Sequence, residues 1–375
     1  MNKEIISQDE SSVTRAIQAI DTIRAGGMVI MTDDEERENE GDLVLAASDV
    51  CPEKISFMAR EGRGLICLSL EAKRIAELRL PMMRGPDHGT APLETAFTVS
   101  IEARKGVTTG ISAADRARTI QVAIDPASGP EDLVVPGHIF PLRARNGGVL
   151  ERTGHTEGSV DLARLAGKHP SAVICEIMND DGSMARKSEL ETFARRHQLP
   201  VLSIADLVTY RLLRETLIEE MVRKPYQSQY GTFTGIWFRN LVDQSVHFAL
   251  INQQQFHPGQ CVDVRVHKQD VLGDVFGDPG HHGNSRRALN YGLELLATKE
   301  HAALLYLCQT DPRRSMITAL EGGSSGMDSR LYGIGAQIIR SLGIEKMTLH
   351  VRSPKNLRGL SGFGIDVCGM EILPE

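Results

Sequence analysis

The stretch MVIMTDDEERENEGDLVLAA, residues 28–47, holds a loop of charged side chains between two apolar runs. The first run, MVIMT, is short and apolar, and this pattern predicts a buried strand. The second run, DLVLAAS at 42–48, predicts another strand that leaves the loop. The charged residues therefore lie beside a sheet, where unpaired charge is costly.

The loop DDEERENE, residues 33–40, carries more carboxylates than its one guanidinium can neutralise. Charged loops are usually solvated surface, and that interpretation stays open. Crowded carboxylates are, however, held well by a hard divalent cation that takes oxygen ligands. Gly41 also lets the backbone turn sharply, so that several side chains can converge. The loop predicts a Mg²⁺ or Mn²⁺ site.

The composition is that of a folded globular protein. The chain has 375 residues, a net charge of −7 and a pI of about 6.0. This acidity argues against a general nucleic-acid binder, and no apolar run is long enough to span a membrane, so we expect a cytoplasmic protein. The six cysteines form no CxxC pair, so neither a disulfide framework nor a thiolate zinc site is indicated.

The length and the alternation of patterns predict two domains, 1–222 and 223–375. A helix over 12–26 can be capped by Ser12 or Thr14, with Ile17 on its apolar face. Apolar strand patterns and amphipathic helix patterns alternate through both halves, and PYQSQYGTFTGIWF at 225–238 predicts an antiparallel element. The predicted fold class is α+β or mixed α/β, each domain being a mixed sheet packed with helices.

Three further polar segments carry chemistry. Residues 145–167 place Arg152, His155 and Thr156 on a turn flanked by glycines, before a helix expected to start near Ser159. Amides, a guanidinium and a hydroxyl there suit a phosphate group. An ordinary capped helix with a surface histidine explains the same pattern.

Next to Gly110, the side chains of Thr108, Thr109 and Ser112 offer a second set of donors to an anion. His138 lies between two prolines in VVPGHIFPLRA, residues 134–144, a segment with little conformational freedom. A lone histidine is more often structural than catalytic, so His138 gains weight only in combination with the other polar segments.

These segments also resemble a known family. The blocks are DDEERENEGDLVLAA (33–47), PMM (81–83), FTVSIEARKGVTTGISAADRARTI (97–120), PGHIFPLRA (136–144), GGVLERTGHTEGSVDLARLAG (147–167) and CEIMNDDGSMAR (175–186). In this order they resemble 3,4-dihydroxy-2-butanone 4-phosphate synthase, which acts on D-ribulose 5-phosphate in riboflavin biosynthesis. The resemblance runs from about residue 14 to residue 210 and implies a homodimer.

The resemblance also implies residue roles. Glu38 and His155 match ligands of two Mg²⁺ or Mn²⁺ ions per active site, and His138 and Glu176 match residues needed for catalysis. The reaction releases formate after a proton is removed from carbon 3 of the sugar. The positions that match substrate contacts are Arg37, Glu38, Asp42, Cys67, Thr109, Arg152, Thr153, Gly154, His155, Thr156 and Glu176.

The second half resembles GTP cyclohydrolase II less completely. VDVRVHKQDVLGDVFG (262–277), YLCQ (306–309) and SPKNLRGLSGFGIDVCGMEILP (353–374) match its segments. That family binds catalytic zinc through three cysteines, but here Asp270 stands at the first position and GDPGHHGNSRR (277–287) has no cysteine. We therefore expect no zinc and no GTP cyclohydrolase II activity.

Two alternatives remain open from the sequence. His267, Asp270, His281 and His282 could form a substitute metal site and make the enzyme bifunctional. Alternatively, the chain is a non-catalytic scaffold or regulator of the riboflavin pathway. The second domain could also bind another enzyme of that pathway.

Overall fold

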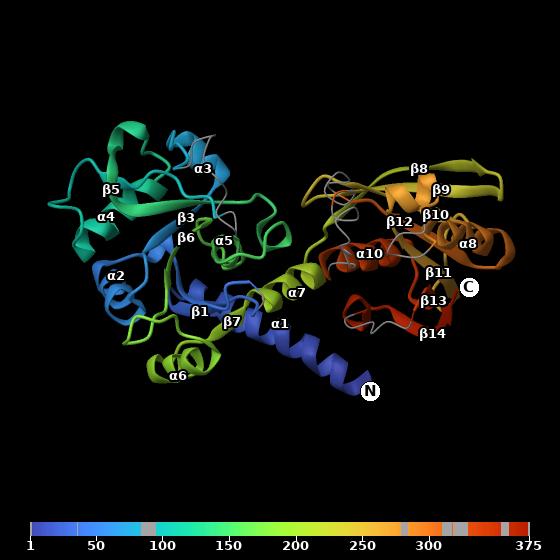
Figure 1. Ribbon diagram of the computed structural model, residues 1–375, viewed down its shortest axis with the longest axis horizontal. Helices are drawn as coiled ribbons and strands as arrows, with labels where there is room; N and C mark the ends of the chain where they lie inside the picture. The colour runs from blue at the N-terminus through green and yellow to red at the C-terminus, as the bar shows by residue number, and fades with distance from the viewer. Residues whose placement is uncertain are drawn as a thin grey trace. The chain divides into compact units, whose positions relative to one another are not determined.

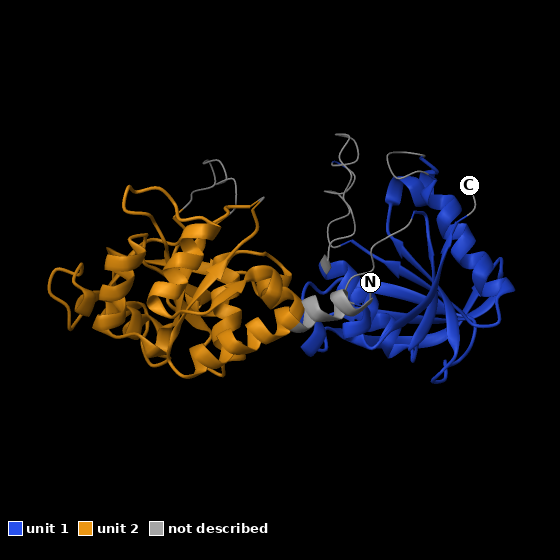
Figure 2. Cartoon of the chain, turned by 90° about the horizontal axis from the view of Figure 1, so that it is seen from below, with its two compact units in different colours: residues 1–9, 211–375 blue, residues 10–210 orange. Residues whose placement is uncertain are grey.

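A computed structural model of the chain divides it into two compact units (Figure 2). One unit contains residues 10–210, and the other contains residues 211–375 together with residues 1–9. The division predicted at residue 222 falls within the first strand of the second unit. The structure describes residues 2–35, 37–83, 95–278, 284–309, 317, 329–353 and 360–373.

The first unit is built on a seven-stranded mixed sheet of order β4-β5-β3-β6-β2-β1-β7. Figure 1 labels β5, β3, β6, β1 and β7 of this sheet. The two strands predicted around the charged loop pair antiparallel, whereas β7 pairs parallel to β1. Strand β2 is buried along its whole length, which explains its continuous apolar run. The strands are β1 Met28–Thr32, β2 Gly41–Ala46, β3 Cys67–Glu71, β4 Ile101–Ala103, β5 Leu133–Ala144, β6 Ser171–Glu176 and β7 Val201–Ser203.

Helices pack around this sheet, and the first of them differs from the prediction. Helix α1 begins at Asn2, so Ser12 lies inside the helix and does not cap it. The residues before Ser12 include neither glycine nor proline, so nothing stops the helix there. Ile17 is 42% exposed, while Ile20 and Ile23 are buried. The helices are α1 Asn2–Arg24, α2 Pro52–Phe57, α3 Ala72–Glu77, α4 Ala113–Ile124, α5 His155–Leu165, α6 Lys187–His197 and α7 Ile204–Arg214.

The second unit has its own seven-stranded mixed sheet, of order β14-β13-β11-β12-β10-β9-β8. The predicted antiparallel element is the β8–β9 hairpin, and β11, β12, β13 and β14 run parallel. Both units thus confirm the predicted fold class. The elements are β8 Ile218–Ser228, β9 Gly231–Asn240, β10 Val246–Ile251, β11 Cys261–Lys268, α8 Ser285–Thr298, β12 Ala302–Leu307, α10 Ser329–Ser341, β13 Lys346–Val351 and β14 Asp366–Ile372.

Within the described residues, no helix is long and apolar enough to cross a membrane.

Candidate active site

Strand register brings several of the predicted residues to one end of the first sheet. Asp42 at the start of β2 is paired with Glu176 at the end of β6. Cys67 begins β3, which pairs with β6 on the side of β6 that faces away from β2. The charged loop joins β1 to β2 at this same end, because Thr32 is paired with Gly41. The pairing therefore assembles carboxylates that are far apart in the sequence.

The charged loop folds around the carboxylate of Asp33, a residue that sequence reasoning did not single out. Its Oδ2 accepts hydrogen bonds from the Arg37 guanidinium at 2.8 Å and from the Glu38 amide at 3.0 Å. Its Oδ1 accepts one from the Glu40 amide at 2.8 Å. An aspartate followed by a polar turn is the usual signal for such side-chain to backbone bonds. Asp33 thus fixes the direction in which Glu38 projects.

His155 is the first residue of α5, and Gly154 is the N-cap. The helix therefore starts four residues before the predicted start at Ser159. Gly158 lies within the helix, and a Cβ there would stand 2.5 Å from the Sδ atom of Met31, so a larger residue would have to displace that side chain. His155 is buried, its Nδ1 lies 3.6 Å from Oε2 of Glu38, and its Nε2 has no hydrogen-bond partner among the described residues.

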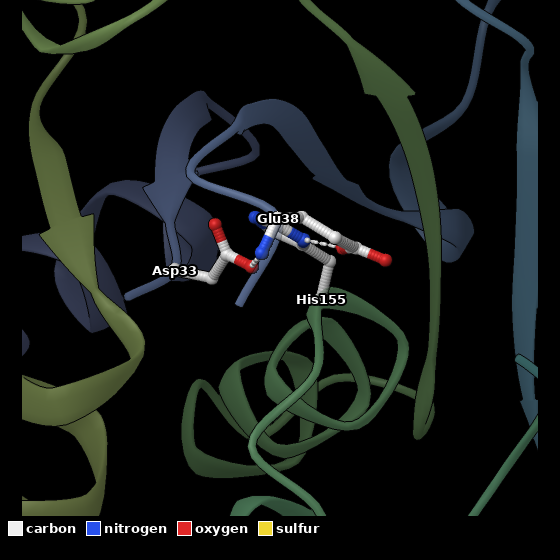
Figure 3. Close-up of side chains that lie close together, drawn as sticks. All are labelled: Asp33, Glu38 and His155. Atoms are coloured by element: carbon white, nitrogen blue, oxygen red, sulfur yellow. Dashed lines mark hydrogen bonds and ion pairs between the residues drawn. The ribbon is translucent and has the colours of Figure 1, made fainter. Parts of the chain in front are cut away.

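Figure 3 shows Asp33, Glu38 and His155 converging from the loop and from the start of α5. Each offers one potential metal ligand atom, and the three atoms lie within 4.8 Å of one another. The imidazole of His155 and the guanidinium of Arg37 lower the pKa of Glu38 to about 2. Although burial opposes the charge, the carboxylates of Asp42, Glu38 and Asp33 raise the pKa of His155 to about 9.

Asp42 differs from its neighbours because it is buried next to other carboxylates. Burial raises its pKa to about 7, and Glu176, Glu38 and Glu40 act in the same direction. Burial likewise raises the pKa of the Cys67 thiol. A site that gathers this many acidic groups either holds protons or binds a cation. One buried imidazole and two carboxylates, whose ligand atoms lie within 4.8 Å of one another, fit a divalent ion with one nitrogen ligand.

In the turn before α5, the guanidinium of Arg152 already has partners within the protein. The Arg152 guanidinium forms an ion pair with buried Glu157 at 2.6 Å and donates to the Thr95 hydroxyl at 3.2 Å. Thr156 is buried in the first helical turn, and Thr153 is exposed. Arg152 is thus held in one orientation at the positive end of the helix, an arrangement that suits an anion.

The donors near Gly110 are arranged differently from the expectation. The carboxylate of Asp115 accepts hydrogen bonds from the Thr108 amide, the Thr108 hydroxyl and the Gly110 amide, at 2.8 to 3.1 Å. Ser112 is the N-cap of α4 and accepts from the Asp115 amide. The donors of Thr108 and the Gly110 amide therefore bind within the protein, whereas the side chain of Thr109 is exposed.

His138 is paired with an acid that the sequence did not reveal as a partner. Its Nδ1 lies 2.7 Å from Oε2 of Glu102, and Thr119 donates to the other oxygen of that carboxylate at 2.8 Å. Glu102 lies in β4 between Ile101 and Ala103, and an acid between apolar residues of a strand is the sequence signal that could have marked it as a functional residue. Gly110 adopts a φ of +90°, and a Cβ there would lie 2.0 Å from Glu102 Oε2 and 2.5 Å from His138 Nδ1.

In the second unit, the two described residues considered for a substitute metal site, His267 and Asp270, have partners within the protein. Nε2 of His267 lies 2.8 Å from Asp274, and Asp270 accepts a hydrogen bond from the Gly273 amide at 3.1 Å. His281 and His282 lie outside the described residues. Among the described residues, neither His267 nor Asp270 belongs to a group of three metal donors.

Comparisons with known proteins agree with the division into two units. The family model 3,4-dihydroxy-2-butanone 4-phosphate synthase matches residues 17–210, and GTP cyclohydrolase II matches residues 219–371. The riboflavin biosynthesis protein RibBA of Aquifex aeolicus is 45% identical to the chain, over 96% of the chain and 92% of that protein.

Two solved structures are also similar. RibBX of A. baumannii, described as a two-domain 3,4-dihydroxy-2-butanone 4-phosphate synthase, is 39% identical with a TM-score of 0.77, over 96% of this chain and 99% of that one. A synthase in complex with two magnesium ions is 43% identical with a TM-score of 0.51, over 53% of this chain and 96% of that one. The chain therefore belongs to the 3,4-dihydroxy-2-butanone 4-phosphate synthase family, here joined to a second unit that matches GTP cyclohydrolase II.

Proposed function

We propose that the first unit converts D-ribulose 5-phosphate to 3,4-dihydroxy-2-butanone 4-phosphate and formate, with two Mg²⁺ or Mn²⁺ ions held in part by Glu38 and His155. The observation that carries this proposal is the convergence of Asp33, Glu38 and the buried His155, whose potential ligand atoms lie within 4.8 Å of one another. The similar synthase solved with two magnesium ions supports it. When bound, the ions polarise oxygens of the sugar and lower the cost of removing its proton.

The other residues have roles that follow from their contacts. Arg152, fixed by Glu157, suits the phosphate of the substrate at the start of α5, together with Thr153, Gly154, Thr156 and Thr109. The imidazole of His138, oriented by Glu102, and the carboxylate of Glu176 serve as proton acceptors or donors. Arg37, Asp42 and Cys67 complete the substrate contacts.

The first experiment incubates the protein with ribulose 5-phosphate and measures formate together with the four-carbon product. We expect both products in equal amounts with Mg²⁺, none after treatment with EDTA, and recovery when Mg²⁺ is added back. Binding of ribulose 5-phosphate without any formate would instead support the scaffold alternative.

We further propose that the second unit has no GTP cyclohydrolase II activity. The proposal is supported by the residue at the first zinc position. Asp270 replaces the first zinc cysteine of the resembled family, and its carboxylate accepts a hydrogen bond from the Gly273 amide. Among the described cysteines, Cys261 and Cys368 are exposed on the sheet, and Cys308 follows β12. We expect no consumption of GTP by the full chain with added Zn²⁺. Formation of a diaminopyrimidine product, or tightly bound zinc, would show that the enzyme is bifunctional.

Assembly as a homodimer also remains a proposal. It is supported by the family resemblance alone, and sedimentation equilibrium of the full chain measures it directly. A mass twice that of the 41.1 kDa chain is expected, whereas a monomer at micromolar concentration would contradict it.

A further inference from the structure

The second unit contains a polar cavity of about 850 Å³ that no motif in the sequence pointed to. It is lined by residues 223–225 of β8, Thr234 of β9, residues 253–255 with His257, and residues 340–343 at the end of α10. Its volume lies in the range of sites that bind metabolites and nucleotides.

The cavity lies at the opposite end of β11 from Asp270, the position at which the resembled family has its first zinc cysteine. Strands β11 and β13 are parallel, and the cavity residues His257 and Gly343 precede their starts. Asp270 follows the other end of β11. A strand of eight residues spans on the order of 25 Å. A ligand in this cavity would therefore be separate from any ligand bound near Asp270.

The lining is basic although the chain as a whole is acidic. Arg223, Lys224 and Arg340 contribute to it, and none of the twelve lining residues is an aspartate or glutamate. The chain has 49 acidic residues against 42 Lys and Arg, so a cavity wall without any carboxylate is a local segregation of charge. Such a wall favours anions.

Carboxylates outside the cavity wall hold the two guanidinium groups in place. Nε and Nη2 of Arg223 bind both oxygens of Glu220 at 2.9 and 2.8 Å, and Nη1 donates to the Gln254 carbonyl at 3.0 Å. Nη1 of Arg340 pairs with Glu345 at 3.0 Å. These pairs cancel part of the charge, so recognition rests on directed donors as much as on net charge. Fixed guanidinium groups with nearby hydroxyls and amides suit the oxygens of a phosphate group.

We propose that this cavity binds a small phosphate-bearing anion, with Arg223 and Arg340 contacting the phosphate. The remaining volume accommodates an attached group the size of a nucleoside or a sugar. Binding here requires no GTP hydrolysis, so the second unit would act as a ligand-binding domain even without a catalytic site.

The chain provides its own probe of this cavity. Trp237 is the one tryptophan in the sequence, and the ammonium of the lining residue Lys224 lies 5.0 Å from its ring centroid. The cation and the ring are close enough to interact, so an anion that draws Lys224 away from the ring changes the fluorescence of Trp237. The Trp237–Lys224 pair and the cavity both belong to the second unit.

The experiment titrates the full chain with inorganic pyrophosphate and follows Trp237 emission. We expect a saturable change in the wild type and a dissociation constant at least about tenfold higher in Arg340→Glu. If the charge reversal in Arg340→Glu impairs folding, Arg340→Gln provides a neutral replacement of similar size. Arg287→Glu, an equal charge change on the exposed first turn of α8, is the matched control and should bind like the wild type.

Absence of any saturable change in the wild type would overturn the proposal, as would equal affinity in the wild type and both Arg340 variants. Citrate provides the last comparison, because it carries similar charge on carboxylates. Equally tight binding of citrate would contradict the assignment to phosphate, whereas a clear preference for pyrophosphate supports it.

Discussion

Each unit buries a histidine with one ring nitrogen that lacks a hydrogen-bond partner among the described residues, Nε2 in His155 and Nδ1 in His267. Their surroundings differ. Next to His155, the carboxylates of Asp33 and Glu38 approach within the reach of a common metal ion. Next to His267, the carboxylate of Asp274 is already saturated by the protein.

Asp274 accepts hydrogen bonds from the Asp270 amide at 3.0 Å and from the hydroxyls of Ser285 and Tyr306 at 2.8 Å, in addition to its contact with His267. A carboxylate with four protein partners has little capacity left for a ligand. Asp33 also accepts three protein hydrogen bonds, but a second carboxylate, that of Glu38, stands beside it and His155. The comparison teaches that a buried histidine and one saturated acid do not make a metal site, whereas a second acid within reach can complete one.

The largest expected effect concerns the carboxylates beside His155. Glu38→Gln keeps the shape of the side chain but removes its charge, so we expect formate release to fall roughly a thousandfold, because metal polarisation contributes several kcal/mol. Glu35→Gln, on the same loop but exposed, is the matched control and should retain activity. Near-normal formate release by Glu38→Gln would remove the metal assignment.

The second prediction tests the structural network. Asp274→Asn leaves His267 without its charged partner, and we expect the second unit to lose about 3 kcal/mol of stability. Urea unfolding measures this, while the formate rate of the folded protein should not change. If activity falls while stability is kept, the network has a role in catalysis that the comparison denies it.

The same network predicts a pH dependence. Burial opposes the charge, but the hydrogen bonds from His267 and the Asp270 amide lower the pKa of Asp274 to about 2. The folded state therefore gains stability from this group above about pH 4 and loses it as the pH falls toward 2. In Asp274→Asn this part of the acid-induced loss should disappear.

Asp42→Asn should behave in the opposite way to Asp274→Asn. Burial raises the pKa of Asp42 to about 7, so its ionisation destabilises the folded state increasingly between about pH 4 and pH 7. Replacing it by a neutral amide should raise stability at pH 8 by about 1 to 3 kcal/mol and reduce formate release. Thermal unfolding without added metal checks the gain, and a loss of stability would contradict the raised pKa.

The smallest expected effect concerns the hydrogen bonds around Asp274 and His267. Tyr306→Phe removes one of the donors to Asp274, and we expect a loss of about 1 kcal/mol in the second unit. Tyr210→Phe, in the first unit, controls for the general effect of losing a hydroxyl. An unchanged midpoint in Tyr306→Phe would mean that three remaining partners already saturate the carboxylate.

Much of the fold followed from local patterns. The strands around the charged loop, the β8–β9 hairpin and the mixed sheets were predictable because apolar periodicity and turn residues mark them directly. The start of α5 was not, because Gly158 looked like a boundary in sequence. It proved to be a packing position against Met31, a contact between segments far apart in the chain.

The candidate site was predictable only in part for a related reason. The family resemblance implied that Glu38 and His155 are metal ligands, and the structure brings the two residues together. For Asp33 and Glu102 the sequence carries only general signals, an aspartate before a polar turn and an acid inside an apolar strand, and these do not identify their partners. The donors near Gly110 were misjudged because their internal partner, Asp115, follows them in what the sequence presents as an ordinary helix.

Gly110 illustrates a constraint that no functional group announces. A side chain there would have to adopt a left-handed backbone and occupy the space of the Glu102 carboxylate and the His138 ring. Selection that maintains the imidazole and its acid must therefore also maintain a residue with no chemistry of its own. In a mutational scan of this chain, Gly110 should tolerate as few replacements as His138 itself.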